Sequence, residues 1–157
     1  MGKEARKTIL KTLRKIGNLK YVEVRGVPMH RDPEFGNLID AKVIERVEKL
    51  VAKGLILKEI PIRGREVAFL RSVFALSQRD FAERLGLSHV AIFKWEKAKN
   101  RRLDLVNEVA VKVLVSGLLG LDIQARLDSL VGHGDTPKRL ALDYSDADAK
   151  SKEEMAA

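Results

Sequence analysis

The chain contains no cysteine among its 157 residues, and only 5% of them are aromatic. The absence of cysteine excludes disulfide bonds, iron–sulfur clusters, thiolate zinc sites and cysteine nucleophiles. The scarcity of aromatic side chains favours aliphatic helices over an aromatic-rich β-sandwich. No apolar run approaches the roughly 20 residues that cross a bilayer, and the basic N-terminus lacks the apolar stretch of a signal peptide. We therefore expect a cytoplasmic protein with no membrane partner.

Residue clusters that carry catalysis or bind metal are also missing from the sequence. The histidines His30, His89 and His133 lie far apart and lack the spacing of metal ligands. Asp32 and Glu34 could mimic an acid–base pair, but no nucleophile, phosphate loop or metal motif accompanies them. We therefore expect no metal, no cofactor and no enzymatic activity.

Positive charge is in excess, because 30 Lys and Arg face 22 Asp and Glu for a formal net charge of +8. Such an excess favours a polyanionic partner: nucleic acid, an acidic membrane or an acidic protein. The alternative is a soluble protein with a basic bias and no such partner. The motifs must decide between these interpretations.

Residues 1–18 have the pattern of a basic amphipathic helix. Ile9, Leu13 and Ile16 recur at near-helical spacing among six basic residues, and Gly17-Asn18 is a plausible end. Such a helix is either solvated or an arm that touches DNA phosphates.

The segment from residue 19 to residue 62 predicts a small β-α-β unit. Alternating residues at 19–27 predict a strand, and an apolar stripe at helical period predicts a helix that Gly54 closes. The β-branched run at 55–62 predicts the second strand.

The most informative pattern lies in residues 76–98. Ser77 can cap a first helix, Gly86 can take the left-handed conformation of a tight turn, and Ser88 can cap a second helix. The buried positions would be Phe81, Ala82, Leu85, Leu87, Ile92 and Trp95. This order of cap, helix, glycine turn, cap and helix is that of a helix-turn-helix, whose second helix can enter the major groove of double-stranded DNA.

Residues 65–131 also resemble an Xre/Cro-type helix-turn-helix domain, as in phage repressors and many antitoxins. The resemblance is carried by the Leu-Ser-Gln opening at Leu76, the Ala82–Gly86 spacing and the stretch from Ser88 to Glu96. It implies five helices that bind double-stranded DNA. Ala98 departs from the family, which usually has glycine there.

The resemblance implies a role for individual positions. The residues that read base edges would be His89, Val90 and Lys94. The residues that contact phosphates would be Gln78, Ser88, Lys97, Lys99, Arg101 and Arg102. The residue chemistry agrees, because lysine suits guanine O6 and N7, and a basic cluster after the recognition helix would give a salt-dependent affinity.

The resemblance also implies a structural ion pair between Glu96 and a basic residue of the preceding helix, here Arg71. We interpret Trp95 as a core residue rather than a platform for base stacking.

Residues 103–131 contain more apolar side chains than a minimal helix-turn-helix requires. We expect the excess to pair two protomers, which would set the recognition helices roughly 34 Å apart on an inverted repeat. The alternative is a larger intrachain core that also buries residues 38–54. The polar, acidic segment 133–157 is expected to be a disordered tail.

The expected fold is therefore α+β and mostly α. A five-helix Xre/Cro-type helix-turn-helix domain (63–132) is preceded by a small β-α-β unit with a basic N-terminal helix (1–62). This domain order is similar to that of MqsA-type antitoxins, where Val24 to Pro28 and the helix after it carry the likeness, although the zinc-binding cysteines of that family are missing here.

The leading functional hypothesis is a transcriptional regulator, a repressor, that acts as a homodimer on a short inverted repeat. The alternative is an antitoxin-like interaction protein that masks a toxin-like partner and autoregulates its own operon. A third interpretation is a helix-turn-helix retained only as a protein-binding scaffold. It fits poorly with the basic cluster after the recognition helix, because surplus charge is costly to keep next to a buried protein contact.

Overall fold

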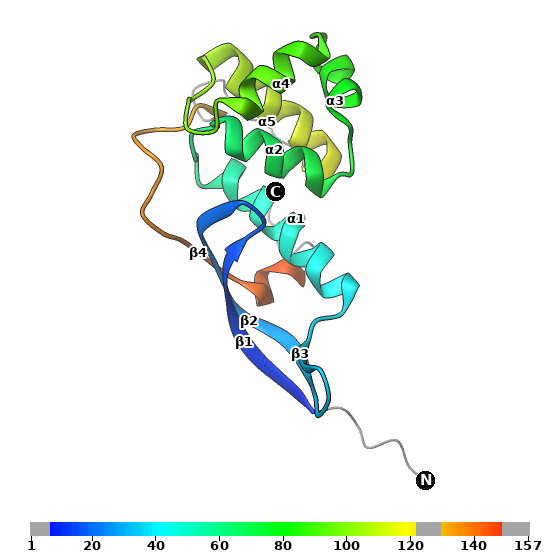
Figure 1. Cartoon of the computed structure of the whole chain (residues 1–157). Coiled ribbons are helices and arrows are strands. Elements are labelled where there is room, and N and C mark those ends of the chain that lie inside the picture. The colour runs from blue at the N-terminus through cyan, green and yellow to red at the C-terminus, as the bar shows by residue number, and fades with distance from the viewer. Residues whose placement is uncertain (1–6, 122–129, 149–157) are drawn as a thin grey trace.

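The computed structural model describes residues 7–121 and 130–148. Its strands are β1 (Thr8–Ile16), β2 (Leu19–Asp32), β3 (Gly36–Leu38) and β4 (Leu140–Asp143). Its helices are α1 (Ala41–Leu57), α2 (Gly64–Val73), α3 (Gln78–Leu85), α4 (His89–Lys97), α5 (Leu105–Leu119) and the 3-10 helix η1 (Tyr144–Asp148). Figure 1 shows α2 to α5 gathered at one end of the molecule and the strands at the other, with α1 between them. No helix in the described part of the chain is both long and apolar enough to cross a membrane.

The sheet is built around β2, the longest strand. β1 pairs with it antiparallel along one edge, and β3 pairs antiparallel with His30–Asp32. β4 pairs in parallel with Val22–Arg25. The result is a four-stranded mixed sheet.

The predicted N-terminal helix is wrong, because residues 8–16 form the edge strand β1. The helical spacing still marks the inward residues, since Ile9, Leu13 and Ile16 are the least exposed positions of β1. A register shift between Arg14 and Ile16, where Lys15 has a φ of 67°, changes the side-chain alternation and so imitates a helical period. Gly17 and Asn18 form the hairpin turn rather than a helix end.

The predicted β-α-β unit is wrong as well. The helix continues past Gly54 to Leu57, and residues 58–62 follow as a connection with no strand, buried only at 60–62. Gly54 is buried inside α1, where an added Cβ would lie 3.1 Å from Leu142 Cδ1. The glycine therefore permits β4 to pack closely on α1, a long-range contact that a C-terminal cap does not predict.

Five α-helices are described, the number expected, but α1 precedes the segment assigned to the helix-turn-helix. Residues 122–129, where a last helix was expected, lie outside the described residues. One buried hydrophobic cluster joins the strands to α1 and to the helices α2 to α5, and it includes Val24, Val51, Leu70, Ile92 and Val111. This agrees with the alternative of a larger intrachain core that extends beyond α2 to α5 and also buries α1.

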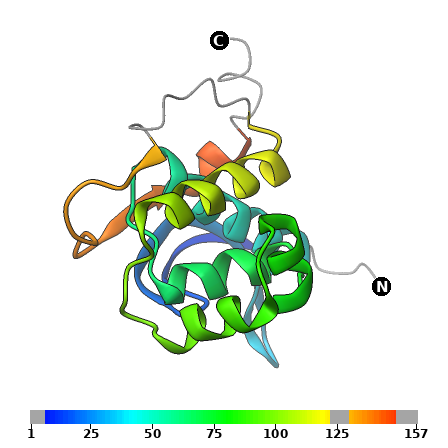
Figure 2. The same cartoon turned by 90° about the horizontal axis from the view of Figure 1, so that it is seen from above.

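The prediction of a disordered tail is wrong for residues 133–148. This segment runs along the helical end of the molecule and then forms β4 and η1 against β2 and α1 (Figure 2). Leu140 and Tyr144 are buried there. A few apolar side chains are thus enough to pack this segment against the core. Residues 149–157 lie outside the described residues.

Candidate nucleic-acid interface

Helices α3 and α4 form a compact pair joined by the turn Gly86-Leu87, which we call the α3–α4 unit. The Ser77 Oγ accepts a hydrogen bond from the Asp80 amide at 3.0 Å, and the Ser88 Oγ accepts one from the Ala91 amide at 3.4 Å. Gly86 has a φ of 69°, the left-handed conformation that costs glycine nothing. Both predicted caps and the predicted glycine turn are confirmed.

The α3–α4 unit buries the positions that the sequence marks as core. Phe81, Ala82 and Ile92 are buried, and Leu85, Leu87 and Trp95 pack against the same cluster at partial exposure. The residues that point outward are His89, Val90, Phe93, Lys94 and Lys97, which are all exposed. A continuous outward face of α4 therefore carries two of the predicted base-reading residues, Val90 and Lys94, beside Lys97.

An ion pair fixes α4 against α2. Arg71 Nε and Nη2 donate to the two carboxylate oxygens of Glu96 at 2.9 and 2.8 Å, and Arg71 Nη1 donates to the Leu76 carbonyl at 3.0 Å. The hydrogen bonds that Arg71 donates to Glu96 raise the pKa of Arg71 above its ordinary value. The pair predicted from the sequence is present, and it sets the orientation of the helix that carries Lys94.

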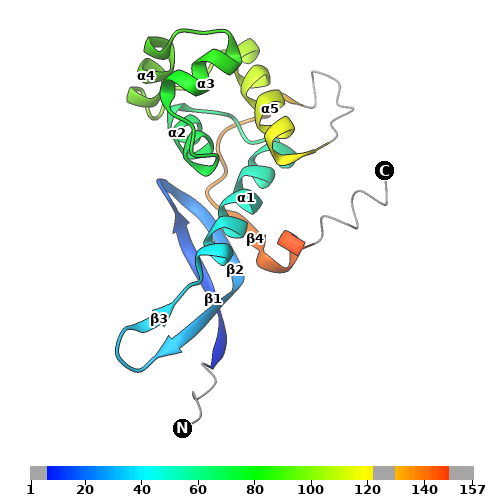
Figure 3. The ribbon, with the colours of Figure 1, turned by 90° about the vertical axis from the view of Figure 1, so that its right-hand side faces the viewer.

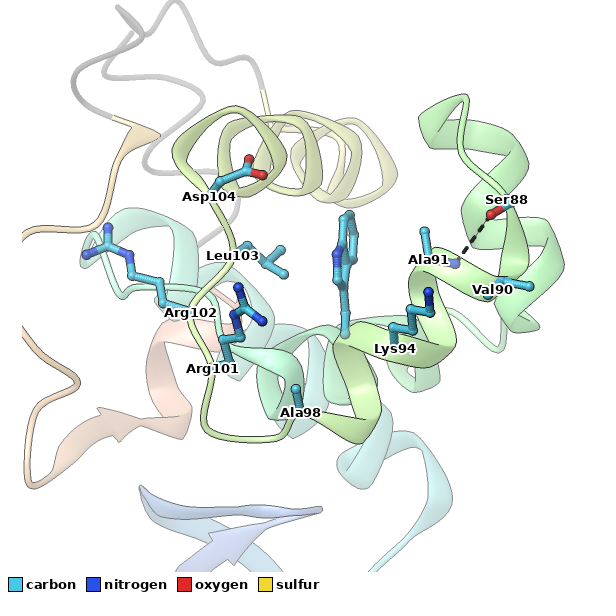
Figure 4. Close-up of a pocket in the computed structure, with 10 residues that line it drawn as sticks. Ser88, Val90, Ala91, Lys94, Ala98, Arg101, Arg102, Leu103 and Asp104 are labelled. Carbon is cyan, nitrogen blue, oxygen red and sulfur yellow. Dashed lines mark hydrogen bonds between the residues drawn. The ribbon is translucent and has the colours of Figure 1, made fainter.

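The loop after α4 adds exposed positive charge to the same side. Lys99 and Arg101 are exposed and make no ion pair with any residue of the described ranges. Between this loop and α4 lies a pocket of about 560 Å³ (Figure 4), lined by Ser88, Val90, Ala91, Lys94, Trp95, Ala98, Arg101, Arg102, Leu103 and Asp104. The acidic member, Asp104, accepts hydrogen bonds from the Asn107 amide and side chain as the cap of α5.

The backbone of this loop is held in place by α2 and the residue before it. The Gly64 amide donates to the Arg101 carbonyl at 3.2 Å, and the Arg65 amide donates to the Lys99 carbonyl at 3.1 Å. Arg63 Nη1 donates to the Asn100 carbonyl at 2.6 Å. Ala98 has a φ of −87°, so this position does not need a left-handed residue such as glycine.

The Arg102 guanidinium is not free to contact a DNA phosphate, contrary to the prediction from the sequence. Its Nε and Nη2 donate to Glu108 at 3.1 and 3.0 Å, and Nη2 also donates to the Gly132 carbonyl at 2.6 Å. Figure 4 shows its side chain on the far side of the loop from Lys94. Arg102 therefore has a structural role in place of the phosphate contact expected from the sequence.

Glu108 is the residue that the sequence analysis missed. Its carboxylate is fully buried, and it accepts hydrogen bonds from Arg102, from the Ile62 amide at 2.7 Å and from the Gly132 amide at 2.9 Å. Burial pushes its pKa upward, but these hydrogen bonds outweigh burial and the pKa lies below its ordinary value of 4.5. The carboxylate thus ties together three segments that are remote in sequence.

A buried lysine accompanies this carboxylate one helical turn later. Lys112 is fully buried, and its Nζ has no hydrogen-bond partner among the described residues. Burial lowers the pKa of Lys112. Glu108 and Lys112 interrupt the apolar stripe of α5 at a spacing of four residues, beside Val111 and Val115. A charged pair at this spacing within an apolar face is the signal that could have revealed the buried cluster.

The remaining predicted residues lie at the edges of the unit. Gln78 is the first residue of α3 and is partly exposed, while His89 is the first residue of α4 and is exposed. No group of three or more His, Asp or Glu side chains gathers as a possible metal site in the described ranges.

Comparisons with known proteins add no family: no protein-family model, no curated protein and no solved structure matches this chain.

Proposed function

We propose that this protein binds double-stranded DNA with the α3–α4 unit, in the manner of a helix-turn-helix. The observation that carries the proposal is the exposed basic face formed by Lys94 and Lys97 on α4 and by Lys99 and Arg101 on the loop after it. None of these four cations is neutralised by a carboxylate in the described part of the chain. Retaining unpaired charge around a capped, exposed helix suits a polyanionic partner.

The proposed roles follow from position and chemistry. The N-terminal part of α4 would enter the major groove, where His89 and Lys94 can hydrogen-bond base edges and Val90, 46% exposed, can contact a thymine methyl. Gln78, Ser88, Lys97, Lys99 and Arg101 would contact phosphates and fix the register of the protein on the duplex.

The biological role that we propose is a transcriptional regulator, a repressor that acts as a dimer on a short inverted repeat. Leu105, Val106 and Val113 of α5 are 55%, 79% and 53% exposed, which is unusual for three apolar residues on one helix and supports pairing with a second protomer. Two copies related by a two-fold axis would present two recognition helices to successive turns of DNA.

The test is footprinting on the DNA upstream of the protein's own gene, repeated over a salt series. We expect a protected inverted repeat, with binding tighter than to random DNA by at least about 4 kcal/mol. The absence of binding to any duplex at low salt would contradict the proposal. A tight complex with a co-purified protein, together with that absence, would favour the antitoxin-like alternative.

A further inference from the structure

The closed end of the β1–β2 hairpin carries two lysines beside the start of α2. Lys15 and Lys20 flank the turn Gly17-Asn18, and both are exposed. Neither makes an ion pair with a residue of the described ranges. Because no acidic residue occurs in β1 or in this turn, the hairpin end is a strongly positive surface.

The hairpin end is fastened to the helical end of the molecule. Asn18 Nδ2 donates to the Arg65 carbonyl at 2.9 Å, and a Cβ added at Gly17 would lie 3.2 Å from the ring of Phe69. Figure 3 shows the turn next to α2. The two lysines therefore keep a fixed position relative to the α3–α4 unit.

Arg65 connects the hairpin turn to the basic loop through its own backbone. Its carbonyl accepts from Asn18, and its amide donates to the Lys99 carbonyl at 3.1 Å. Its guanidinium is used locally, because it lies over the ring of Tyr21 at 5.1 Å and is paired with Glu66. A single residue, Arg65, thus links the turn that Lys15 and Lys20 flank to the loop that carries Lys99 and Arg101.

We infer that the hairpin turn is a second phosphate-contacting element, which extends the DNA contact beyond the α3–α4 unit. The inference rests on the proposed function, since it adds contacts to the same duplex. The ligand is the sugar–phosphate backbone of double-stranded DNA. The Asn18 amide is bound to the Arg65 carbonyl and the Tyr21 ring lies under the Arg65 guanidinium, so the exposed lysines are the groups of this turn that can meet phosphates. The N-terminal sheet is then a part of the DNA-binding surface.

The experiment compares the double variant Lys15→Gln/Lys20→Gln with the full-length wild type on a specific duplex and on a random duplex. The slope of log K against log salt is negative, and each lost phosphate contact reduces its magnitude by about 0.9. We expect the variant to reduce this slope by about 1.8, to weaken binding to both duplexes alike by about tenfold near physiological salt, and to shorten the footprint on one side. The preference for the specific duplex should not change.

The matched control is Lys7→Gln/Lys42→Gln, which removes the same net charge at exposed positions before β1 and at the start of α1. An equal effect of both variants, or no effect of Lys15→Gln/Lys20→Gln at an unchanged thermal midpoint, would overturn the inference. If Lys99→Ala/Arg101→Ala loses affinity while the hairpin variant does not, the proposed function stands and the hairpin contact falls. If the wild type binds neither duplex, the proposed function fails first.

Discussion

Gly64, the first residue of α2, lies directly against the backbone carbonyl of Trp95 on α4. A Cβ at Gly64 would overlap the Trp95 oxygen and would lie 2.7 Å from the Ala98 oxygen. These neighbours are backbone atoms, so they cannot move away without moving the end of α4. The contact is therefore one of the tightest links between the two helices.

The variant Gly64→Ala should lower the free energy of unfolding by about 1–3 kcal/mol, because the added methyl forces the backbones apart. It should also weaken DNA binding, since the end of α4 leads into the basic loop. Urea denaturation and fluorescence anisotropy measure the two effects. Gly117→Ala is the control, because a Cβ added at Gly117 would meet no described atom within 4 Å apart from its chain neighbours and its own helix backbone. An equally stable Gly64→Ala protein would contradict the close contact.

The Arg71–Glu96 pair should contribute to stability through both charges. The two side chains are only 24% and 11% exposed, so Arg71→Met would leave a poorly solvated carboxylate and an unpaired Leu76 carbonyl. We expect a loss of about 1–3 kcal/mol in the free energy of unfolding. A double-mutant cycle with Glu96→Gln checks the assignment, and a coupling energy near zero would show that the pair is incidental.

Lys94→Ala should relax the sequence preference of DNA binding at one base pair. If Lys94 donates to a guanine, discrimination at that position falls by about 1–3 kcal/mol. Competition binding against duplexes substituted at each position measures this loss. Lys97→Ala, a neighbour on the same face, should instead weaken binding to all duplexes alike. An unchanged preference in Lys94→Ala would refute the base-reading assignment.

Lys99→Ala/Arg101→Ala should reduce the salt dependence of binding without a change in specificity. The loss of two phosphate contacts reduces the magnitude of the negative slope of log K against log salt by about 1.8. Arg102→Ala provides the contrast, because this residue is bound to Glu108 and to Gly132. It should lower the thermal midpoint while its effect on the slope stays small. The opposite outcome would return Arg102 to the DNA surface.

Glu108 should make the protein sensitive to acid. Its pKa in the folded protein lies below the ordinary value of 4.5, so the folded state favours the charged form. The stability that this group contributes is complete above the unfolded pKa and is lost as the pH falls through the folded pKa. We expect the free energy of unfolding to decline below about pH 4.5, and Glu108→Gln to show a shallower decline from a lower starting stability.

Glu66 is the control for this pH dependence. It is also fully buried, but burial raises its pKa, so its contribution has the opposite sign and is lost as the pH rises. Glu66→Gln should therefore leave the acid decline in place. Chemical denaturation at several pH values measures these free energies of unfolding. If they decline equally in acid for the wild type and Glu108→Gln, Glu108 is not the source of the acid sensitivity.

The parts of the molecule that the sequence predicts well are those that local chemistry specifies. Ser77, Gly86 and Ser88 act within three or four residues of their own positions, so the bounds of α3 and α4 could be predicted from the caps and the turn. The Arg71–Glu96 pair followed only because a family pattern supplied the long-range partner.

The parts that could not be predicted depend on contacts between remote segments. β1 is a strand because β2 pairs with it, and the irregular register at Lys15 conceals the two-residue period. β4 pairs with a strand more than a hundred residues earlier, which no local pattern reveals. From the sequence, Arg102 is expected to contact phosphate like its basic neighbours. Only the structure shows that its guanidinium forms an ion pair with Glu108.

The parallel pairing of β4 with β2 has a consequence for biosynthesis. The edge of β2 between Val22 and Arg25 has its partner only in residues 140–143, which leave the ribosome after every helix from α1 to α5. A nascent chain can assemble the hairpin and the helices early, but it cannot complete the sheet until residues 140–143 have been made. A premature stop before Leu140 would therefore release a chain with an open strand edge, which chaperones or proteases can recognise.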